Sequence, residues 1–257
     1  MIAKDKFLMD EIPFEKFEKL GISKQDFLAM PKELADTVLN GRVTPLLNTR
    51  FHADNGKVIE MRMKLQLTHD DNGTVLLQTY PIRKQIDNVY NLTDRELKKV
   101  EEGNVIKKEV TEEGEKKVKF IQLDKETKSL ISRSVATVRL ANKLRDMEKI
   151  NDIELGANQK QAAQEGKPIE LSVGDQKVTV GVDLREPQGF KVVNGDMKEW
   201  ERQMMIRYDE EHEGFMGYVK TDENRWEYQQ VVNKLSGKQD AETKEKKDEI
   251  KIGGMKL

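Results

Sequence analysis

The chain has 257 residues, of which 36% are charged and 36% are apolar. The charged share is well above the roughly one quarter that is usual in soluble domains, which favours several small cores over one thick core. Because 45 basic residues nearly balance 47 acidic ones, no global field marks the chain as a binder of nucleic acid or membranes, and the absence of cysteine excludes disulfides, thiolate metal sites and a cysteine nucleophile.

The first 29 residues predict a helical segment. Residues 11–30 are typical of a helix that stops at Gly21 and a second short helix, with an apolar side formed by Phe14, Phe17, Leu20, Phe27 and Leu28. The N-terminus holds no apolar run long enough for a signal peptide, and no later segment approaches the length of a membrane span. We therefore expect a soluble protein of the cytoplasm without membrane contact.

A repeat with a period near 62 residues follows this segment. Gly41, Gly103 and Gly166 are spaced by 62 and 63 residues, and each ends a short run of helix-favouring residues. Glycine at the end of a helix supplies a left-handed residue that a Cβ would penalise. Each glycine also precedes a strand-like run. The pattern predicts that one block was duplicated, with coincidental glycine caps in an α+β protein as the alternative.

Two further strands are predicted in each block. The second strands, at 57–68, 116–124 and 176–184, show alternating apolar and polar residues, and turn-forming residues separate them from a third strand. The predicted fold class is α+β, built from tandem small modules of about 62 residues, each with a short helix, a glycine joint and antiparallel strands. Such a module buries too little apolar surface to stand alone, so we expect neighbouring modules to pack together.

The predicted boundaries follow from these joints. The helical segment covers residues 1–29, the first module 30–91, the second module with a trailing helix 92–154, the third module with a helix and a C-terminal hairpin 155–234, and a charged, flexible tail 235–257. The trailing helix is expected at 134–150 and another helix at 196–213. The hairpin at 215–232 is expected to turn at Asp222–Asn224.

Candidate catalytic and metal-binding residues are few. His69 beside Asp70 and Asp71 suits a divalent metal site, but the same residues form a strong hairpin-turn sequence. His212 lies among carboxylates that suit either zinc binding or a solvated helix end. Phosphate-binding glycine loops and a GxSxG serine elbow are absent from the sequence. We therefore predict no catalytic residue, no metal ligand, no cofactor and no enzyme activity.

The second module carries the densest positive charge. A hairpin could gather the lysines of its strands into one strip, next to further basic residues in the segment that follows. Interleaved glutamates weaken that field, and Phe120 suits a core better than it suits base stacking. The alternatives are therefore a nucleic-acid surface and an ordinary solvated sheet edge. The candidate nucleic-acid residues are Lys107, Lys108, Lys116, Lys117, Lys119, Arg133, Arg139, Lys143 and Arg145.

Aromatic residues gather in the C-terminal hairpin. Alternation along a strand places Trp226 and Tyr228 on the same side, and Tyr218 lies on the preceding strand. The interpretation that we favour is that these side chains cover the core of the third module. The alternative is an exposed protein-binding patch formed by Tyr218, Trp226 and Tyr228.

The opening IPFEKFEKLGI, the MPKEL segment and the joint at Leu39, Gly41 and Thr44–Leu47 carry a resemblance. They look like the N-terminal domain of a family of proteins of unknown function from gut Bacteroidetes, usually encoded on plasmids, conjugative elements and related mobile DNA. The blocks that begin at LTDRELKKVEEG and ANQKQAAQEGKPIEL are similar to a companion repeat domain, also of unknown function, although the third block lacks the LT-x-E start. The resemblance implies mobile-element biology, the cytoplasm and a partner in DNA handling, and it transfers no catalytic residue.

The sequence thus leads to three functional hypotheses. The first is a non-catalytic binding or scaffold protein that acts through protein–protein contacts in conjugation, replication or phage conflict. The second is a nucleic-acid-binding accessory protein that uses the basic surface of the second module. The third is a metal-dependent enzyme built around His69 or His212.

Overall fold

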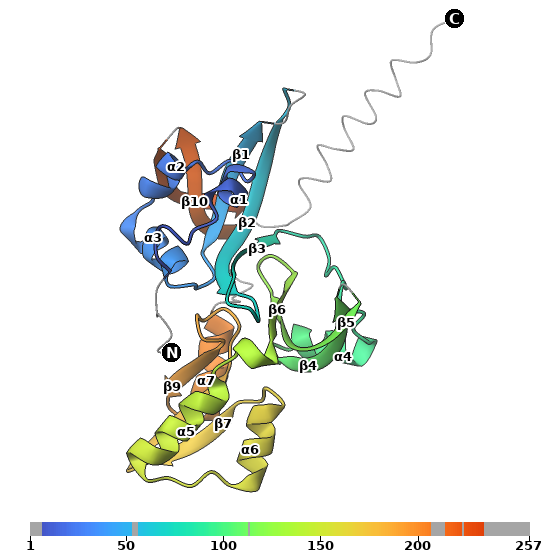
Figure 1. The fold of residues 1–257 in the computed structure, drawn as a ribbon, viewed down its shortest axis with the longest axis vertical. Coiled ribbons are helices and arrows are strands. Elements are labelled where there is room, and N and C mark those ends of the chain that lie inside the picture. Colours follow the sequence, from blue (N-terminus) through green and yellow to red (C-terminus); the bar gives the residue numbers. More distant parts are fainter. Residues whose placement is uncertain (1–6, 53–55, 113, 207–213, 223, 234–257) are drawn as a thin grey trace, which may run out of the picture.

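The computed structural model describes residues 7–52, 56–112, 114–206, 214–222 and 224–233. It is mixed α+β, with three sheets and several short helices, which confirms the predicted fold class (Figure 1). A short helix followed by three antiparallel strands occurs three times. The first unit is α3 (Lys32–Leu39), β1 (Leu46–His52), β2 (Val58–His69) and β3 (Val75–Pro81); the second is α4 (Asp94–Glu101), β4 (Ile106–Glu112), β5 (Glu115–Asp124) and β6 (Ser129–Ser134); the third is α6 (Ala157–Gln164), β7 (Ile169–Val173), β8 (Gln176–Val182) and β9 (Phe190–Asn194).

Each unit turns from its helix to its first strand through the same local motif. Gly41, Gly103 and Gly166 have φ angles of 67°, 90° and 82°, in the left-handed region that favours glycine. The amide of each glycine donates to the carbonyl three residues earlier, and the next amide donates to the carbonyl five residues earlier, as Arg42 does to Thr37 at 3.1 Å. These two bonds make up the Schellman motif. All three glycines therefore close their helices in the same way.

Two short helices precede the first unit. α1 (Phe14–Glu18) and α2 (Lys24–Leu28) match the predicted pair, and Gly21 lies between them with a φ of 74°. Phe17 and Phe27 from these helices meet edge to face, with ring centroids 5.4 Å apart, inside the core of the first unit. Phe14, Phe17, Leu20 and Phe27 of the predicted apolar side therefore pack in the core of the first unit, whereas Leu28 is 64% exposed and its place on that side is a wrong prediction.

Further helices follow the second and third units. η1 (Val135–Thr137) and α5 (Leu140–Asn151) come after β6, and α7 (Met197–Ile206) comes after β9. The rest of the helix predicted at 196–213 lies outside the described residues, as does the charged tail predicted at 235–257. Within the described parts of the chain, none of the helices combines the length and the apolarity that crossing a membrane requires.

The C-terminal hairpin forms as predicted but belongs to a different unit. β10 (Gly214–Asp222) and β11 (Arg225–Asn233) pair with each other, and β10 also pairs in parallel with β1, giving the sheet order β11-β10-β1-β2-β3. Figure 1 shows β10, in orange, beside the blue strands of the first unit. The interpretation that the hairpin covers the core of the third module is therefore wrong. Tyr218 and Trp226 instead enter the core of the first unit, with Phe17 and Leu47.

Asp26 holds the hairpin against α2. Its carboxylate accepts bonds from Lys220 Nζ at 2.6 Å and from the Asn224 amide at 2.9 Å, and it completes a capping box with Ser23. The Trp226 indole N–H donates to the Asp26 carbonyl at 2.9 Å. Burial on its own would raise the pKa of Asp26, but the bonds from Lys220, Ser23 and Asn224 outweigh it and hold the pKa below its usual value.

The loop between β8 and β9 joins the three sheets. The Leu184 carbonyl accepts a bond from Gln66 of the first unit at 3.0 Å, and the Leu184 amide donates to Gln122 of the second unit at 2.7 Å. Gln66 and Gln122 are both buried, so these bonds satisfy amide groups that would otherwise be costly to desolvate. Lys64 and Asp124 add a buried ion pair at 2.8 Å between the first and second units. The apolar core next to this joint contains side chains from all three units.

Candidate binding groove between the second and third units

A groove of about 740 Å³ lies where the second and third units meet. One wall comes from α4 and the chain that follows it, including Lys99 and Val105. The opposite wall comes from the joint of the third unit at Lys167 and from α7. The groove therefore depends on the packing of two units and exists in neither of them alone.

The side of the groove on α7 is apolar. Met197, Trp200 and Met204 recur at helical spacing and all line it. The Trp200 ring lies on Gly181 of β8, where a Cβ would approach within 2.8 Å of the ring, so glycine is needed for this contact. Trp200 is 6% exposed, whereas Met197 and Met204 are half-buried. The methionines thus leave part of their apolar surface open to the groove.

Charged side chains of both signs surround this apolar surface. Lys167 and Glu165 form an ion pair at 2.6 Å, and bonds from Lys167 and Gln161 hold the pKa of Glu165 below its usual value. Four lysines and four glutamates line the groove, so it has no dominant field of one sign. The charged lining residues are Lys99, Lys107, Lys125, Lys167, Glu96, Glu102, Glu165 and Glu201.

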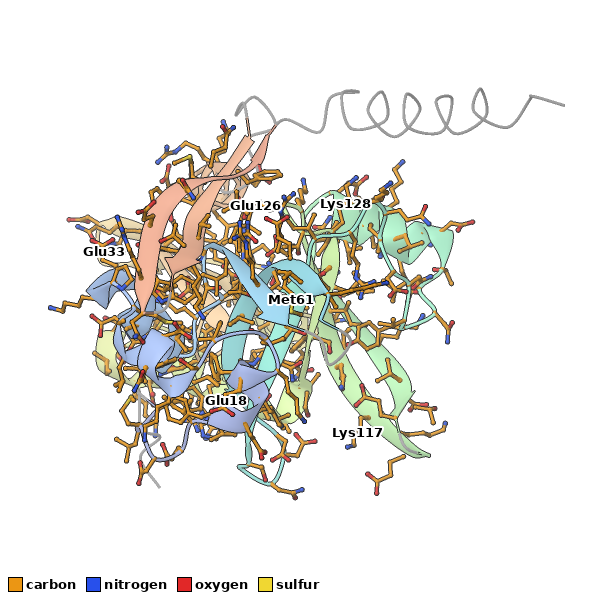
Figure 2. All side chains as sticks on the ribbon, turned by 90° about the horizontal axis from the view of Figure 1, so that it is seen from above. Glu18, Glu33, Met61, Lys117, Glu126 and Lys128 are labelled. Atoms are coloured by element: carbon orange, nitrogen blue, oxygen red, sulfur yellow. The ribbon has the colours of Figure 1, made fainter. Side chains whose placement is uncertain are left out.

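The lysines predicted to form one positive strip lie on two faces of the β4–β5 hairpin. Lys108 is paired across the strands with Lys119, and Lys117 shares their face, whereas Lys107 and Lys116 occupy the other face. Figure 2 shows Lys117 near the outer end of this hairpin. The prediction that the hairpin gathers these lysines into one strip is therefore wrong.

Glutamates neutralise most of these lysines. Lys108 binds Glu96 at 2.7 Å, and the ion pairs Lys116–Glu109, Lys119–Glu112 and Lys117–Glu115 measure 2.8, 2.5 and 3.7 Å. Glu96 also accepts the Thr93 amide at the start of α4, so the Lys108 contact fastens β4 to that helix. Glu109, Glu112 and Glu115, which interleave with the lysines in the sequence, are thus their ion-pair partners.

One of the other predicted basic residues is buried. Arg133 is 8% exposed and donates to the carbonyls of Glu186 and Pro187 at 3.0 and 2.9 Å, and burial lowers its pKa. It fastens the β8–β9 loop to the second unit, so its place in a nucleic-acid surface is a wrong prediction. Arg139 and Arg145 are exposed and Lys143 is half-buried.

The three predicted partner-binding aromatics have different environments. Trp226 and Tyr218 are each 8% exposed, and desolvation raises the pKa of Tyr218. Tyr228 is 59% exposed, and its ring contacts Tyr218 at a centroid distance of 5.1 Å. The alternative prediction of an exposed patch formed by all three aromatics is therefore wrong, because only Tyr228 of the three is open to solvent.

The histidines that suggested a metal site have other neighbours. His69 stacks on Phe7 with ring centroids 4.7 Å apart, and Asp70 accepts the amides of Asn72 and Thr74 in the turn after β2. The described residues hold no group of three or more metal-ligating side chains. His212 lies outside the described residues. The sequence HDDNG thus forms the hairpin turn that was its alternative interpretation.

Sequence reasoning did not find the groove. The stripe of Met197, Trp200 and Met204 on α7 was available as a signal, since its helical spacing indicates a packing face. No sequence pattern indicates that Lys99 and Val105 face this stripe, because they lie about 100 residues earlier in the chain. Only the contact between the two units brings the walls together.

Comparison with known proteins identifies one region of the chain. No curated protein and no solved structure matches the sequence. A family model matches the N-terminal part of the chain, which covers α1 to β3 and the residues that lead to the second unit. It includes the IPFEKFEKLGI opening and the joint at Gly41, on which the resemblance to an N-terminal domain of unknown function rests. Residues 7–90 match the family described as "Protein of unknown function (DUF4099)".

Proposed function

We propose that this chain is a non-catalytic binding protein that holds a segment of another protein in the groove between its second and third units. The observation that carries the proposal is the apolar surface of Met197 and Met204, left half-buried beside charges of both signs. Protein interfaces combine an apolar centre, in which methionine is enriched, with a polar rim. Flexible methionine side chains also adapt to the shape of a partner.

The balance of charge favours a protein partner over a nucleic acid. A surface that binds phosphates needs an excess of lysine and arginine, since release of counterions drives the binding. In this groove lysines and glutamates are matched in number, and the lysines of the nearby hairpin are mostly ion-paired. A peptide segment that carries apolar side chains flanked by both charge signs complements such a surface.

The biological setting of the proposal rests on sequence resemblance. The likeness to domains encoded on mobile DNA supports a role in the cytoplasm, in conjugation, replication or phage conflict. A scaffold that joins two proteins in such a process needs surfaces on a rigid support. The buried bonds of Gln66 and Gln122 to the β8–β9 loop support a rigid arrangement of the units.

A pull-down from the native host tests the proposal. The full chain is immobilised, and the lysate is applied with and without nuclease. The chain with Lys99→Glu and Glu201→Lys reverses two exposed charges on opposite walls of the groove. Lys98→Glu is the matched control, because Lys98 is exposed on the same helix as Lys99 and does not line the groove.

The proposal predicts one protein partner in both lysates, with recovery that falls roughly tenfold for the groove variant and stays unchanged for the control. Loss of every partner after nuclease treatment would favour nucleic-acid binding instead. Equal recovery by the groove variant and the control would exclude the groove as the interface.

A further inference from the structure

A second, smaller cavity enters the core shared by the second and third units. Its volume is about 290 Å³, and it lies between the sheet of the second unit and helices α5 and α6. Its apolar lining includes the buried side chains of Phe120, Val138, Leu144 and Leu155 and the half-buried Ala163. A cavity with this lining can pack against the apolar part of a ligand but offers it few hydrogen-bond partners.

Three cations lie where the cavity meets solvent. Lys107, Arg145 and Lys160 all line it, and all three are exposed. Glu148 is the single carboxylate in the lining; it lies 3.4 Å from Lys160 and accepts the Leu155 amide at 3.0 Å. Glu148 therefore balances Lys160, and the positive charge that remains at the mouth belongs to Lys107 and Arg145.

The two remaining cations have no strong carboxylate partner. Among the described residues, no carboxylate forms a hydrogen bond or an ion pair with Lys107 or Arg145. Glu165 interacts electrostatically with Lys107, but it is already bonded to Lys167. The mouth of the cavity is therefore a place for one further anionic group.

We propose that this cavity binds a small amphipathic carboxylate, with its apolar body against Phe120 and Leu144 and its carboxylate between Lys107 and Arg145. Arginine suits this group because its planar guanidinium can donate two parallel bonds to a carboxylate. The apolar interior gives a purely ionic ligand such as inorganic phosphate no favourable contact. The small volume restricts the ligand to a short alkyl chain or a single ring system. This inference concerns a cavity other than the proposed protein-binding groove, and Lys107 is a lining residue of both.

A titration of the full chain with sodium decanoate, followed by NMR of the methyl groups of Val138, Leu144 and Leu155, tests the proposal. Decanol and decylammonium serve as neutral and cationic probes with the same alkyl chain. Decanoate should shift these methyl signals in a saturable way and bind roughly tenfold more tightly than decanol, since one charge-assisted bond is lost in the alcohol. Equal binding of all three probes, or no shift with decanoate, would overturn the proposal.

Substitutions assign the binding to this cavity. Arg145→Gln should weaken decanoate binding roughly tenfold and leave decanol binding unchanged, because it removes only the partner of the carboxylate. Lys149→Gln is the matched control, since Lys149 is exposed on the same helix and does not line the cavity. Ala163→Met fills the cavity and should abolish binding of both probes. If Ala163→Met does not fold, the comparison of Arg145→Gln with Lys149→Gln still tests the site. Equal affinities of these two variants for decanoate would overturn the proposal.

Discussion

Replacement of Asp26 by asparagine should uncouple the C-terminal hairpin from the N-terminal helices. Asp26 is 2% exposed, and its carboxylate holds Lys220 Nζ at 2.6 Å. Asparagine keeps the size of the side chain and one oxygen that can accept the Asn224 amide, but its NH2 group replaces the oxygen that accepts from Lys220 and Ser23. The substitution therefore removes the negative charge together with these bonds. The Lys220 ammonium, on a side chain that is 17% exposed, then remains without its counter-ion.

The expected loss of stability follows from this geometry. Breaking a buried ion pair by removing one partner costs about 3–5 kcal/mol, because the other charge stays desolvated. Lys220 also donates to the Gly21 carbonyl at 2.9 Å, a bond that survives the substitution. We therefore expect Asp26→Asn to lower the free energy of unfolding by about 3 kcal/mol, at the lower end of that range.

Urea denaturation monitored by tryptophan fluorescence measures this effect, since Trp226 donates to the Asp26 carbonyl and lies in the affected core. The control is a double-mutant cycle with Lys220→Met, which removes the cation instead of its partner. The two substitutions together should cost less than the sum of their separate costs. A loss below about 1 kcal/mol for Asp26→Asn, or strictly additive costs in the cycle, would refute the reasoning.

The pH dependence of stability gives a second measurement on the same residue. The pKa of Asp26 is lowered in the folded state, so the stability that it contributes is complete above its unfolded pKa of about 3.9 and is lost as the pH falls through the folded pKa. Between pH 5 and pH 2, the native chain should therefore lose more stability than Asp26→Asn does. Parallel pH profiles for the two chains would contradict the assignment of the shift to Asp26.

Glycine substitutions test two other parts of the fold. Gly217→Ala should cost about 3 kcal/mol or more, since its Cβ would lie 2.2 Å from the Leu46 carbonyl oxygen in the parallel β1–β10 pair; a smaller loss in urea denaturation would show that this pair is not needed. Gly103→Ala should cost only about 1–2 kcal/mol for its left-handed φ, because its Cβ would meet open space. Gly166→Ala should cost more than Gly103→Ala, since its Cβ would also meet the Phe120 ring at 2.8 Å. In thermal unfolding, Gly166→Ala should therefore lower the melting temperature more than Gly103→Ala, and the reverse order would refute the steric argument.

The repeated helix, glycine and strands could be read from the sequence because every interaction that defines them is local. The Schellman bonds at Gly41, Gly103 and Gly166 join residues three and five apart, and a single glycine supplies the φ angle that they need. The β10–β11 hairpin was predictable for the same reason, since a short turn fixes its pairing. Such features need no knowledge of the rest of the chain.

The placement of these elements could not be read in the same way. A strand edge can pair with any other free edge, and β10 lies beside β1 where Asp26, far away in the sequence, also holds Lys220 and Asn224. The sequence predicts Arg133 as a surface cation, but in the fold it is buried and donates to the carbonyls of Glu186 and Pro187. The groove and the smaller cavity likewise arise only where two units meet. Local patterns specify backbone geometry, whereas burial and neighbours depend on contacts between residues that the chain separates by many positions.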